Sequence, residues 1–194
     1  MDFVLDLDKS LFVFFNSLGS EYFDSFWLFI SESDIIEVIY LFLVIEFLRF
    51  FKIKDLKSIL IFLLSMILMI VFTDQSSNFF KEFFERLRPC HNPELIEIIR
   101  IVKDGCGGLY GFFSAHAANT FAFASFIYFL TPNENNYKRT SFLLFIWAAI
   151  ISYSRIYIGV HFPLDIIIGA IYGLLSGYLF HKPFLYFRKS KLIL

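Results

Sequence analysis

Long apolar segments constrain the fold of this 194-residue chain more than any other feature. Five segments approach the length that an α-helix needs to cross a bilayer, and they are residues 35–51, 58–80, 114–131, 140–157 and 163–181. The composition agrees, because 58% of the residues are hydrophobic and 18% are charged, against about a quarter in soluble domains. A soluble domain of this length has too little core for so many apolar side chains. We therefore expect one all-α domain over residues 1–194, a polytopic membrane helix bundle of five or six spans.

The N-terminal segment, residues 9–31, is apolar at both ends but polar in the middle. The interrupting residues are Asn16, Gly19, Glu21 and Asp24. A lipid-exposed span tolerates such residues badly. We expect residues 1–34 to form interfacial or partly spanning helices, with a sixth span over 9–31 as the alternative. The acidic start of the chain does not resemble the basic start of a cleavable signal peptide.

Basic residues between the apolar segments predict the orientation. They gather at three places, namely Arg49, Lys52, Lys54 and Lys57, then Lys138 and Arg139, and finally Lys182, Arg188, Lys189 and Lys191. If all five segments cross, these places share one side, and the positive-inside rule makes it cytoplasmic. Loop 81–113 and turn 158–162 then face the periplasm or exterior of a plasma (inner) membrane. The net charge of −1 gives no reason to expect nucleic acid as a partner, and the oligomeric state is not predicted.

Polar side chains gather at the outward end of the second apolar segment, where lipid would not tolerate them. They are Asp74, Asn78, Lys81 and Arg88. Steps of four, three and seven residues place all four on one face if the helix continues through them, and Pro89 then ends or bends it. We expect this face to look into the bundle. The alternative is that Lys81 and Arg88 extend to the membrane interface.

The third apolar segment begins behind a glycine-rich stretch with Phe113, Ser114, Ala115 and His116. Ser114 is a candidate N-cap. The free N–H groups and the positive dipole end of a helix suit a phosphate at such a start. The alternative is an ordinary capped helix with a histidine in its first turn.

The fourth and fifth apolar segments meet at a run that holds Arg155, His161, Pro163 and Asp165. Pro163 suits the first turn of a helix, and a carboxylate four residues after His161 can orient its imidazole. Together with the earlier segments, the outward ends supply three cations, two histidines and one carboxylate. Such cations can hold the three non-bridging oxygens of a phosphoryl group, while one histidine attacks phosphorus and the other protonates the leaving oxygen. No cluster has the spacing of a metal site.

Two further patterns predict how the helix ends are held together. Gly169, Gly173 and Gly177 recur every four residues, which lets another helix approach closely. Cys90 and Cys106 both lie in the outward loop, where a disulfide would link the part that carries Arg88 to the part that leads to His116. Two free cysteines are the alternative, since the sequence does not give the Cα separation.

Three of these runs, in this order, resemble the motifs of the type 2 phosphatidic acid phosphatase family of integral membrane lipid phosphatases. The first motif is Lys81, six residues, then Arg88-Pro89, and the third is Ser154-Arg155, five residues, His161, three residues, Asp165. The second motif, usually Pro-Ser-Gly-His, is Phe113-Ser114-Ala115-His116 here. Ala115 keeps a backbone N–H but adds a methyl group, and Phe113 replaces a turn-forming proline. The resemblance spans about residues 58–181, which we take as the catalytic core.

The resemblance implies a role for each motif residue. His161 is the nucleophile that forms a phosphohistidine, Asp165 orients it, and His116 protonates the leaving group and then activates water. Lys81, Arg88 and Arg155 hold the phosphate, together with Ser114 and the Ala115 N–H. The family implies a metal-independent hydrolase without a cofactor.

The substrate expected from this resemblance is a lipid phosphate or diphosphate at the outer membrane face. Undecaprenyl diphosphate is the first choice, and the alternatives are phosphatidylglycerophosphate, phosphatidic acid and the 1-phosphate of lipid A. An inactive membrane scaffold or lipid-binding protein is the non-enzymatic alternative. The presence of His116, His161 and Asp165 favours the enzyme.

Overall fold

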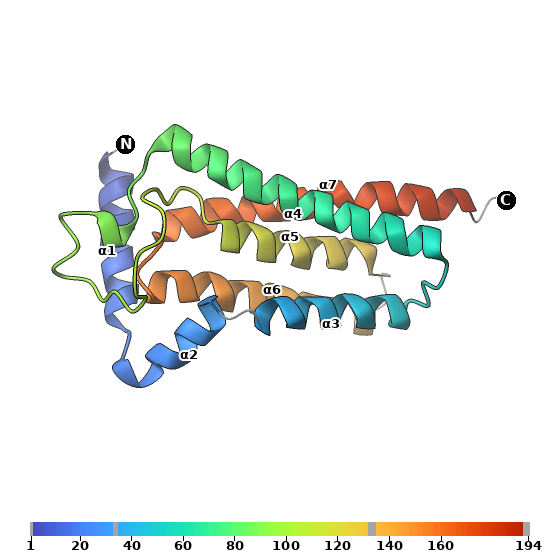
Figure 1. Ribbon diagram of the computed structural model, residues 1–194, viewed down its shortest axis with the longest axis horizontal. Coiled ribbons are helices and arrows are strands. Elements are labelled where there is room, and N and C mark those ends of the chain that lie inside the picture. The colour runs from blue at the N-terminus through green and yellow to red at the C-terminus, as the bar shows by residue number, and fades with distance from the viewer. Residues whose placement is uncertain (1, 33–34, 132–134, 192–194) are drawn as a thin grey trace.

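The computed structural model describes residues 2–32, 35–131 and 135–191, and each element of secondary structure named in this part is a helix (Figure 1). The α-helices are α1 (Asp2–Ser17), α2 (Glu21–Glu32), α3 (Ile35–Phe50), α4 (Leu56–Phe84), α5 (Ala115–Leu130), α6 (Asn135–Tyr157) and α7 (Pro163–Lys191). A short 3₁₀ helix, Pro89–His91, lies in the long loop between α4 and α5. This arrangement confirms the expected all-α bundle.

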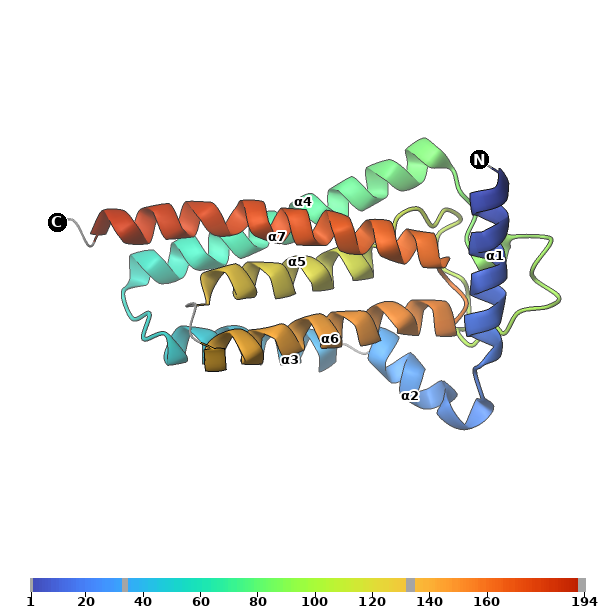
Figure 2. The ribbon, with the colours of Figure 1, turned by 180° about the vertical axis from the view of Figure 1, so that it is seen from behind.

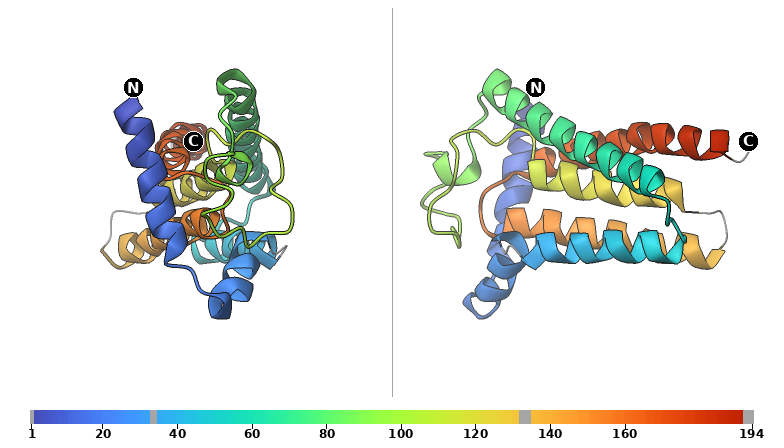
Figure 3. Two further views of the ribbon diagram at one scale, coloured as in Figure 1. Left: turned by 90° about the vertical axis from the view of Figure 1, so that its left-hand side faces the viewer. Right: turned by 45° about the vertical axis from the view of Figure 1, so that its right-hand side comes forward.

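The helices α3 to α7 run along the long axis of the molecule, and α1 lies across one end of them (Figures 1 and 2). Helix α5 is central, because it packs against α4, α6 and α7. At the end that α1 crosses, which we call the α1 end, α4 and α6 finish while α5 and α7 begin (Figure 3). The long loop 85–114 also lies at the α1 end, so the three motif regions come together there.

Glycines set the distance between α5 and α7. An added Cβ at Gly173 would lie 2.2 Å from the Ala118 carbonyl oxygen, and one at Gly177 would lie 2.4 Å from the Ala122 carbonyl oxygen. At Gly169 the corresponding distance to the Ser114 carbonyl oxygen is 2.7 Å. The two backbones are therefore in direct contact along the row, which confirms the packing role expected from the four-residue spacing.

The five expected apolar segments all become helices, with different ends. Helices α3 and α5 have 16 residues each, α6 begins at Asn135 rather than at 140, and α7 continues to Lys191 rather than 181. Charged residues after 181 do not end α7, because the helix keeps packing. Phe184 is 1% exposed, and its ring centroid lies 5.6 Å from that of Phe62.

The outer surface of the bundle is apolar. Leu60, Leu64 and Leu68 on α4 are all at least half exposed, and so are Ile167 and Leu175 on α7. By length and composition, Leu56–Phe84 and Pro163–Phe187 are the two described helices long enough to cross a membrane, and Ser141–Tyr157 is a shorter apolar helix. Lipid is the solvent that such a surface requires.

The N-terminal region consists of two helices rather than one continuous helix over 9–31. Helix α1 exposes Phe3, Leu7 and Phe14 and buries Asp8 and Asn16, the reverse of a soluble surface helix. The Asn16 amide donates to the carbonyl oxygens of Tyr157 (3.0 Å) and Ile156 (3.2 Å) at the end of α6. The polar residues of this region thus serve the bundle end. Its polar-in, apolar-out pattern is typical of an interfacial helix.

The glycine contact predicts that Gly173→Ala destabilises the protein, by roughly 1–3 kcal/mol, because the methyl group forces α5 and α7 apart. Thermal unfolding in detergent, followed by the fluorescence of Trp27 and Trp147, measures the effect. Gly108→Ala is the matched control, since an added Cβ there meets nothing within 4 Å. Equal transition temperatures for the two variants would contradict the packing account.

Candidate active site

The second motif forms the start of α5. Ser114 is its N-cap, with an extended backbone and a side chain that accepts a hydrogen bond from the Ala117 N–H at 3.4 Å. His116 therefore lies in the first turn, and its side chain is exposed. Because α5 begins here, its unpaired N–H groups and its positive dipole end lie at the α1 end, next to His116. The N-cap expected from the sequence is confirmed.

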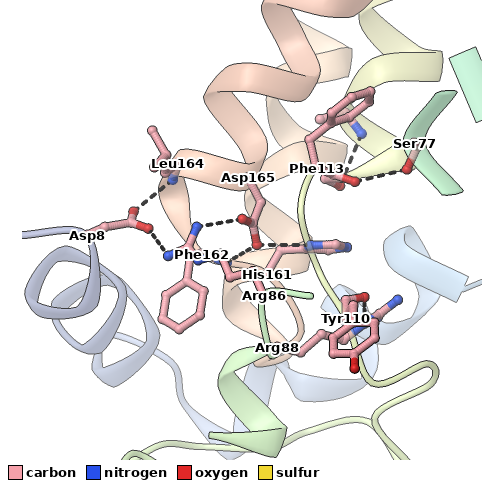
Figure 4. Close-up of polar contacts among 12 residues, drawn as sticks. Asp8, Ser77, Arg86, Arg88, Tyr110, Phe113, His161, Phe162, Leu164 and Asp165 are labelled. Carbon is pink, nitrogen blue, oxygen red and sulfur yellow. Dashed lines mark hydrogen bonds and ion pairs between the residues drawn. The ribbon is translucent and has the colours of Figure 1, made fainter. Parts of the chain in front are cut away.

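The third motif places His161 and Asp165 side by side at the start of α7, which begins at Pro163 as expected (Figure 4). The His161 Nδ1 and Asp165 Oδ2 atoms are 3.4 Å apart, and the two residues are 2% and 0% exposed. The Phe162 N–H also donates to Oδ2, at 3.0 Å. The Ser114 N–H donates to the Asp165 carbonyl oxygen at 3.1 Å, so the second and third motifs are joined through backbone.

Burial lowers the pKa of His161 well below its ordinary value, and the positive charges of Arg155, Arg88 and Lys81 lower it further. The imidazole is therefore neutral at neutral pH. A neutral imidazole whose Nδ1 faces a carboxylate has its Nε2 lone pair free to attack an electrophile. The geometry thus suits a histidine nucleophile.

The three cations expected at the site come from three different elements. Lys81 lies on the last turn of α4 and its Nζ is 3.4 Å from the Asn78 Oδ1. Arg88 lies in the loop, where its Nε donates to the Tyr110 carbonyl oxygen and its Nη1 to the Cys106 carbonyl oxygen, both at 3.2 Å. Arg155 lies on the last turn of α6 and is 3% exposed. The charges of all three lower the pKa of His161, so the three cations lie near it.

The expectation that Arg88 shares a helix face with Asp74, Asn78 and Lys81 is wrong. Helix α4 ends at Phe84, because Glu85 adopts the left-handed conformation (φ 47°) and its N–H closes onto the Lys81 carbonyl oxygen. The chain then runs extended, and Leu87 forms an isolated antiparallel bridge with Tyr110. Asn78 is exposed rather than turned into the bundle. Arg88 reaches the site from the loop.

The structure adds two ionic contacts that the sequence analysis did not identify. Arg86 lies between two carboxylates, with Nη1 at 2.7 Å from the Asp165 Oδ1 and Nη2 at 2.5 Å from the Asp8 Oδ2. Burial raises the pKa of Asp8, and hydrogen bonds from Arg86 and from the Leu164 N–H act in the opposite direction. No local pattern links these partners, since Asp8 is 78 residues from Arg86.

The second contact joins Arg155 to α2. The Arg155 Nη1 donates to the Ser31 carbonyl oxygen at 3.1 Å, and it also contacts the Ser31 hydroxyl and the Glu32 carboxylate. Lys103, from the long loop, pairs with the other Glu32 oxygen at 2.5 Å. A carboxylate thus lies beside one of the cations expected to hold phosphate.

The long loop is closed by a bond between Cys90 and Cys106, whose Cα atoms are 6.0 Å apart. Cys90 follows the Arg88-Pro89 pair directly, and the Cys106 carbonyl oxygen accepts a hydrogen bond from Arg88. The disulfide therefore lies next to a proposed phosphate ligand. Among the described residues, no three His, Cys, Asp or Glu side chains are grouped as a metal site requires.

Comparison with known proteins agrees with this geometry. The chain matches the model of the PAP2 superfamily over residues 58–189. A lipid A 4'-phosphatase of Porphyromonas gingivalis is 35% identical over 194 residues, which covers 97% of this chain and 77% of that protein. A lipid A 4'-phosphatase of Bacteroides thetaiotaomicron is 34% identical over 184 residues, which covers 93% and 78%.

Two crystal structures share the fold. LpxE of Aquifex aeolicus superposes with a TM-score of 0.61 and 26% identity, covering 91% of this chain and 95% of that one. The PAP2-type phosphatidylglycerolphosphate phosphatase of Bacillus subtilis has a TM-score of 0.69 and 19% identity, covering 93% and 85%. The fold and these matches define a membrane lipid phosphatase. The chain belongs to the PAP2 superfamily and is a phosphoric monoester hydrolase.

The disulfide next to Arg88 predicts that its removal lowers stability. Cys90→Ser with Cys106→Ser frees a loop of about 16 residues, so the free energy of unfolding should fall by about 3 kcal/mol. Thermal unfolding in detergent checks the double variant against the wild type. Intact mass after thiol alkylation, with and without reduction, checks the bond itself. Two alkylated cysteines in the unreduced, denatured protein would contradict it.

Proposed function

We propose that this enzyme hydrolyses the 4'-phosphate monoester of lipid A and releases inorganic phosphate. Similarity along almost the whole chain to two proteins named lipid A 4'-phosphatase supports the substrate. The buried His161–Asp165 pair, with the charges of three cations acting on His161, supports the reaction and is the observation that carries the proposal. Lipid A was expected only as an alternative and at its 1-phosphate. Undecaprenyl diphosphate, the first choice from sequence, becomes a comparison substrate.

The reaction proceeds in two displacements. In the first, the His161 Nε2 attacks phosphorus, a P–N bond forms, and the P–O bond to the sugar breaks. His116 gives its proton to the leaving oxygen, so lipid A departs as an alcohol. In the second, His116, now neutral, takes a proton from water as the oxygen attacks phosphorus. The P–N bond breaks, His161 is regenerated and phosphate leaves.

The surrounding groups stabilise the charge on the phosphoryl oxygens. Lys81, Arg88 and Arg155 offer N–H donors from three different elements, and the Ala115 N–H and the α5 dipole add to them. Ser114 holds the start of α5 in place and its hydroxyl lies at the same end. Asp165 orients His161 and balances the positive charge of the phosphohistidine. No step requires a metal ion.

The fit of lipid A to this end of the bundle follows from where the groups lie. The proposed phosphate ligands lie on the helix ends and the loop at the α1 end. Exposed apolar side chains, among them Phe79 and Phe83 on the last turns of α4, lie near the same end. A phosphate held there leaves the acyl chains of its lipid along the outside of the bundle. We place the α1 end at the outer face of the membrane, because the basic clusters of the sequence lie at the opposite end.

The substrate is tested by phosphate release from a panel, with purified protein in detergent micelles and EDTA present. We expect release from lipid A that carries only the 4'-phosphate, and much slower release from lipid A that carries only the 1-phosphate. Undecaprenyl diphosphate, phosphatidylglycerophosphate and phosphatidic acid complete the panel. Faster turnover of any of these three would overturn the choice of lipid A.

A matched pair of variants controls the panel. His161→Ala removes the nucleophile and should abolish turnover of every substrate. His91→Ala, which removes a histidine that contacts the Gly107 carbonyl oxygen in the loop, should leave the panel unchanged. Full activity of a folded His161→Ala protein would contradict the mechanism whatever the lipid. Activity lost in EDTA and restored by metal would contradict the metal-free reaction.

The orientation predicts opposite labelling of single cysteines at the two ends. In a background without Cys90 and Cys106, Glu97→Cys should react with an impermeant thiol reagent in intact cells. Lys54→Cys, at the opposite end, should react only after lysis, and both side chains are exposed. The reverse pattern would place the active site in the cytoplasm.

A further inference from the structure

Arg86 occupies a fixed position between the N-terminal helix and the catalytic pair (Figure 4). Its carbonyl oxygen accepts a hydrogen bond from the Gly111 N–H at 2.8 Å, so its backbone is tied to the segment that leads into α5. Its guanidinium lies over the Phe162 ring, with Cζ 4.3 Å from the centroid. Neither contact depends on substrate, so Arg86 is held in place before any lipid arrives.

The two oxygens of Asp165 have different partners. Oδ1 accepts from the Arg86 Nη1 at 2.7 Å. Oδ2 accepts from the Phe162 N–H at 3.0 Å and lies 3.4 Å from the His161 Nδ1. Arg86 therefore fixes the rotation of the carboxylate and leaves Oδ2 directed at the imidazole. Without such a partner, the ionised form of a fully buried carboxylate would have a high free-energy cost.

We propose that Arg86 is a positioning residue for catalysis, which keeps Asp165 ionised and directed at His161, and that Asp8 of α1 tunes this effect by sharing the guanidinium. The proposal rests on the proposed roles of His161 and Asp165. By this proposal, helix α1 contributes a side chain that acts on the active site, in addition to packing against the end of the bundle.

Several charged groups act on Asp165 from the elements packed around it. They are Arg86 and Arg88 of the long loop, Lys81 of α4, Asp8 of α1 and His161 of the preceding turn. Arg86 is in direct contact with the carboxylate. Arg88 and Lys81 act on it through their charge, from a longer distance. Removing the charge of Arg86 or of Asp8 should therefore move the ionisation of Asp165 in opposite directions.

The test is the pH dependence of kcat for Arg86→Met and Asp8→Asn. Arg86→Met should lower kcat by roughly 10²-fold, because the carboxylate loses its orientation. The acidic limb of its pH–kcat profile should move up by roughly one pH unit, since the Asp165 carboxylate takes up a proton more readily without the Arg86 cation. Asp8→Asn removes the competing carboxylate, so its acidic limb should move down while KM stays near the wild-type value.

Two further variants separate positioning from folding. Arg86→Lys keeps a positive charge but cannot bridge two carboxylates in the same way, so the acidic limb should return toward wild type with kcat only partly recovered. Arg100→Gln is the matched control. Arg100 also ties an N-terminal helix to the long loop, through Asp24 at 2.9 Å, but it does not contact Asp165. Its loss should lower thermal stability and leave the acidic limb in place.

The profiles are measured on whichever lipid phosphate the wild type hydrolyses fastest, so a wrong choice of lipid A does not affect them. Acidic limbs that coincide in Arg86→Met, Asp8→Asn and wild type would overturn the proposal. So would an equal shift in Arg100→Gln. Full activity of a folded His161→Ala protein would instead overturn the proposed mechanism on which the inference rests.

Discussion

Direct backbone contact between α5 and α7 is the constraint on which the active site depends. The glycine row on α7 lets the two helices touch, and Gly169, four residues after Asp165, faces the Ser114 carbonyl oxygen. The Ser114 N–H in turn donates to the Asp165 carbonyl oxygen. The first turns that carry His116 and Asp165 are therefore held in one register. A bulky side chain at Gly169 would push against the Ser114 carbonyl oxygen and so displace the first turn of α5, which carries His116.

The second constraint is that charged side chains at the α1 end must be paired. Several buried or half-buried charged side chains meet at the α1 end, where a charge without a partner is costly. Arg86 pairs with Asp165 and Asp8, and Arg155 pairs with Glu32. Lys81 and Arg88 have neutral hydrogen-bond acceptors rather than carboxylates in direct contact. Positive charge is thus left over where the phosphate is expected. Burial is the main cause of the lowered pKa of His161, and the charges of Arg155, Arg88 and Lys81 lower it further.

Features with local causes could be predicted from the sequence. The Ser114 cap, the start of α7 at Pro163, the proximity of His161 and Asp165 and the glycine row all follow from residues within one or two turns. The sequence could not show that Arg88 lies in the loop rather than on α4. The helix ends at Phe84 because Glu85 is left-handed, and a glutamate gives no sign of that conformation. The loop bridge between Leu87 and Tyr110 requires that ending, and the bridge is a tertiary contact.

The contacts that no local pattern predicts are those of the N-terminal helices, and they extend the active site that we propose to α1 and α2. Asn16 binds the end of α6 across 141 residues, and Glu32 binds Arg155 across 123. Asn16 and Glu32 thus bind residues of the third motif region. Asp8 binds Arg86, which itself pairs with Asp165 of that motif. The three motifs span only part of the chain, and the superfamily model begins at residue 58. The two lipid A 4'-phosphatases are nevertheless similar over 97% and 93% of the chain. We expect similarity of that extent if the proposed site includes carboxylates from α1 and α2.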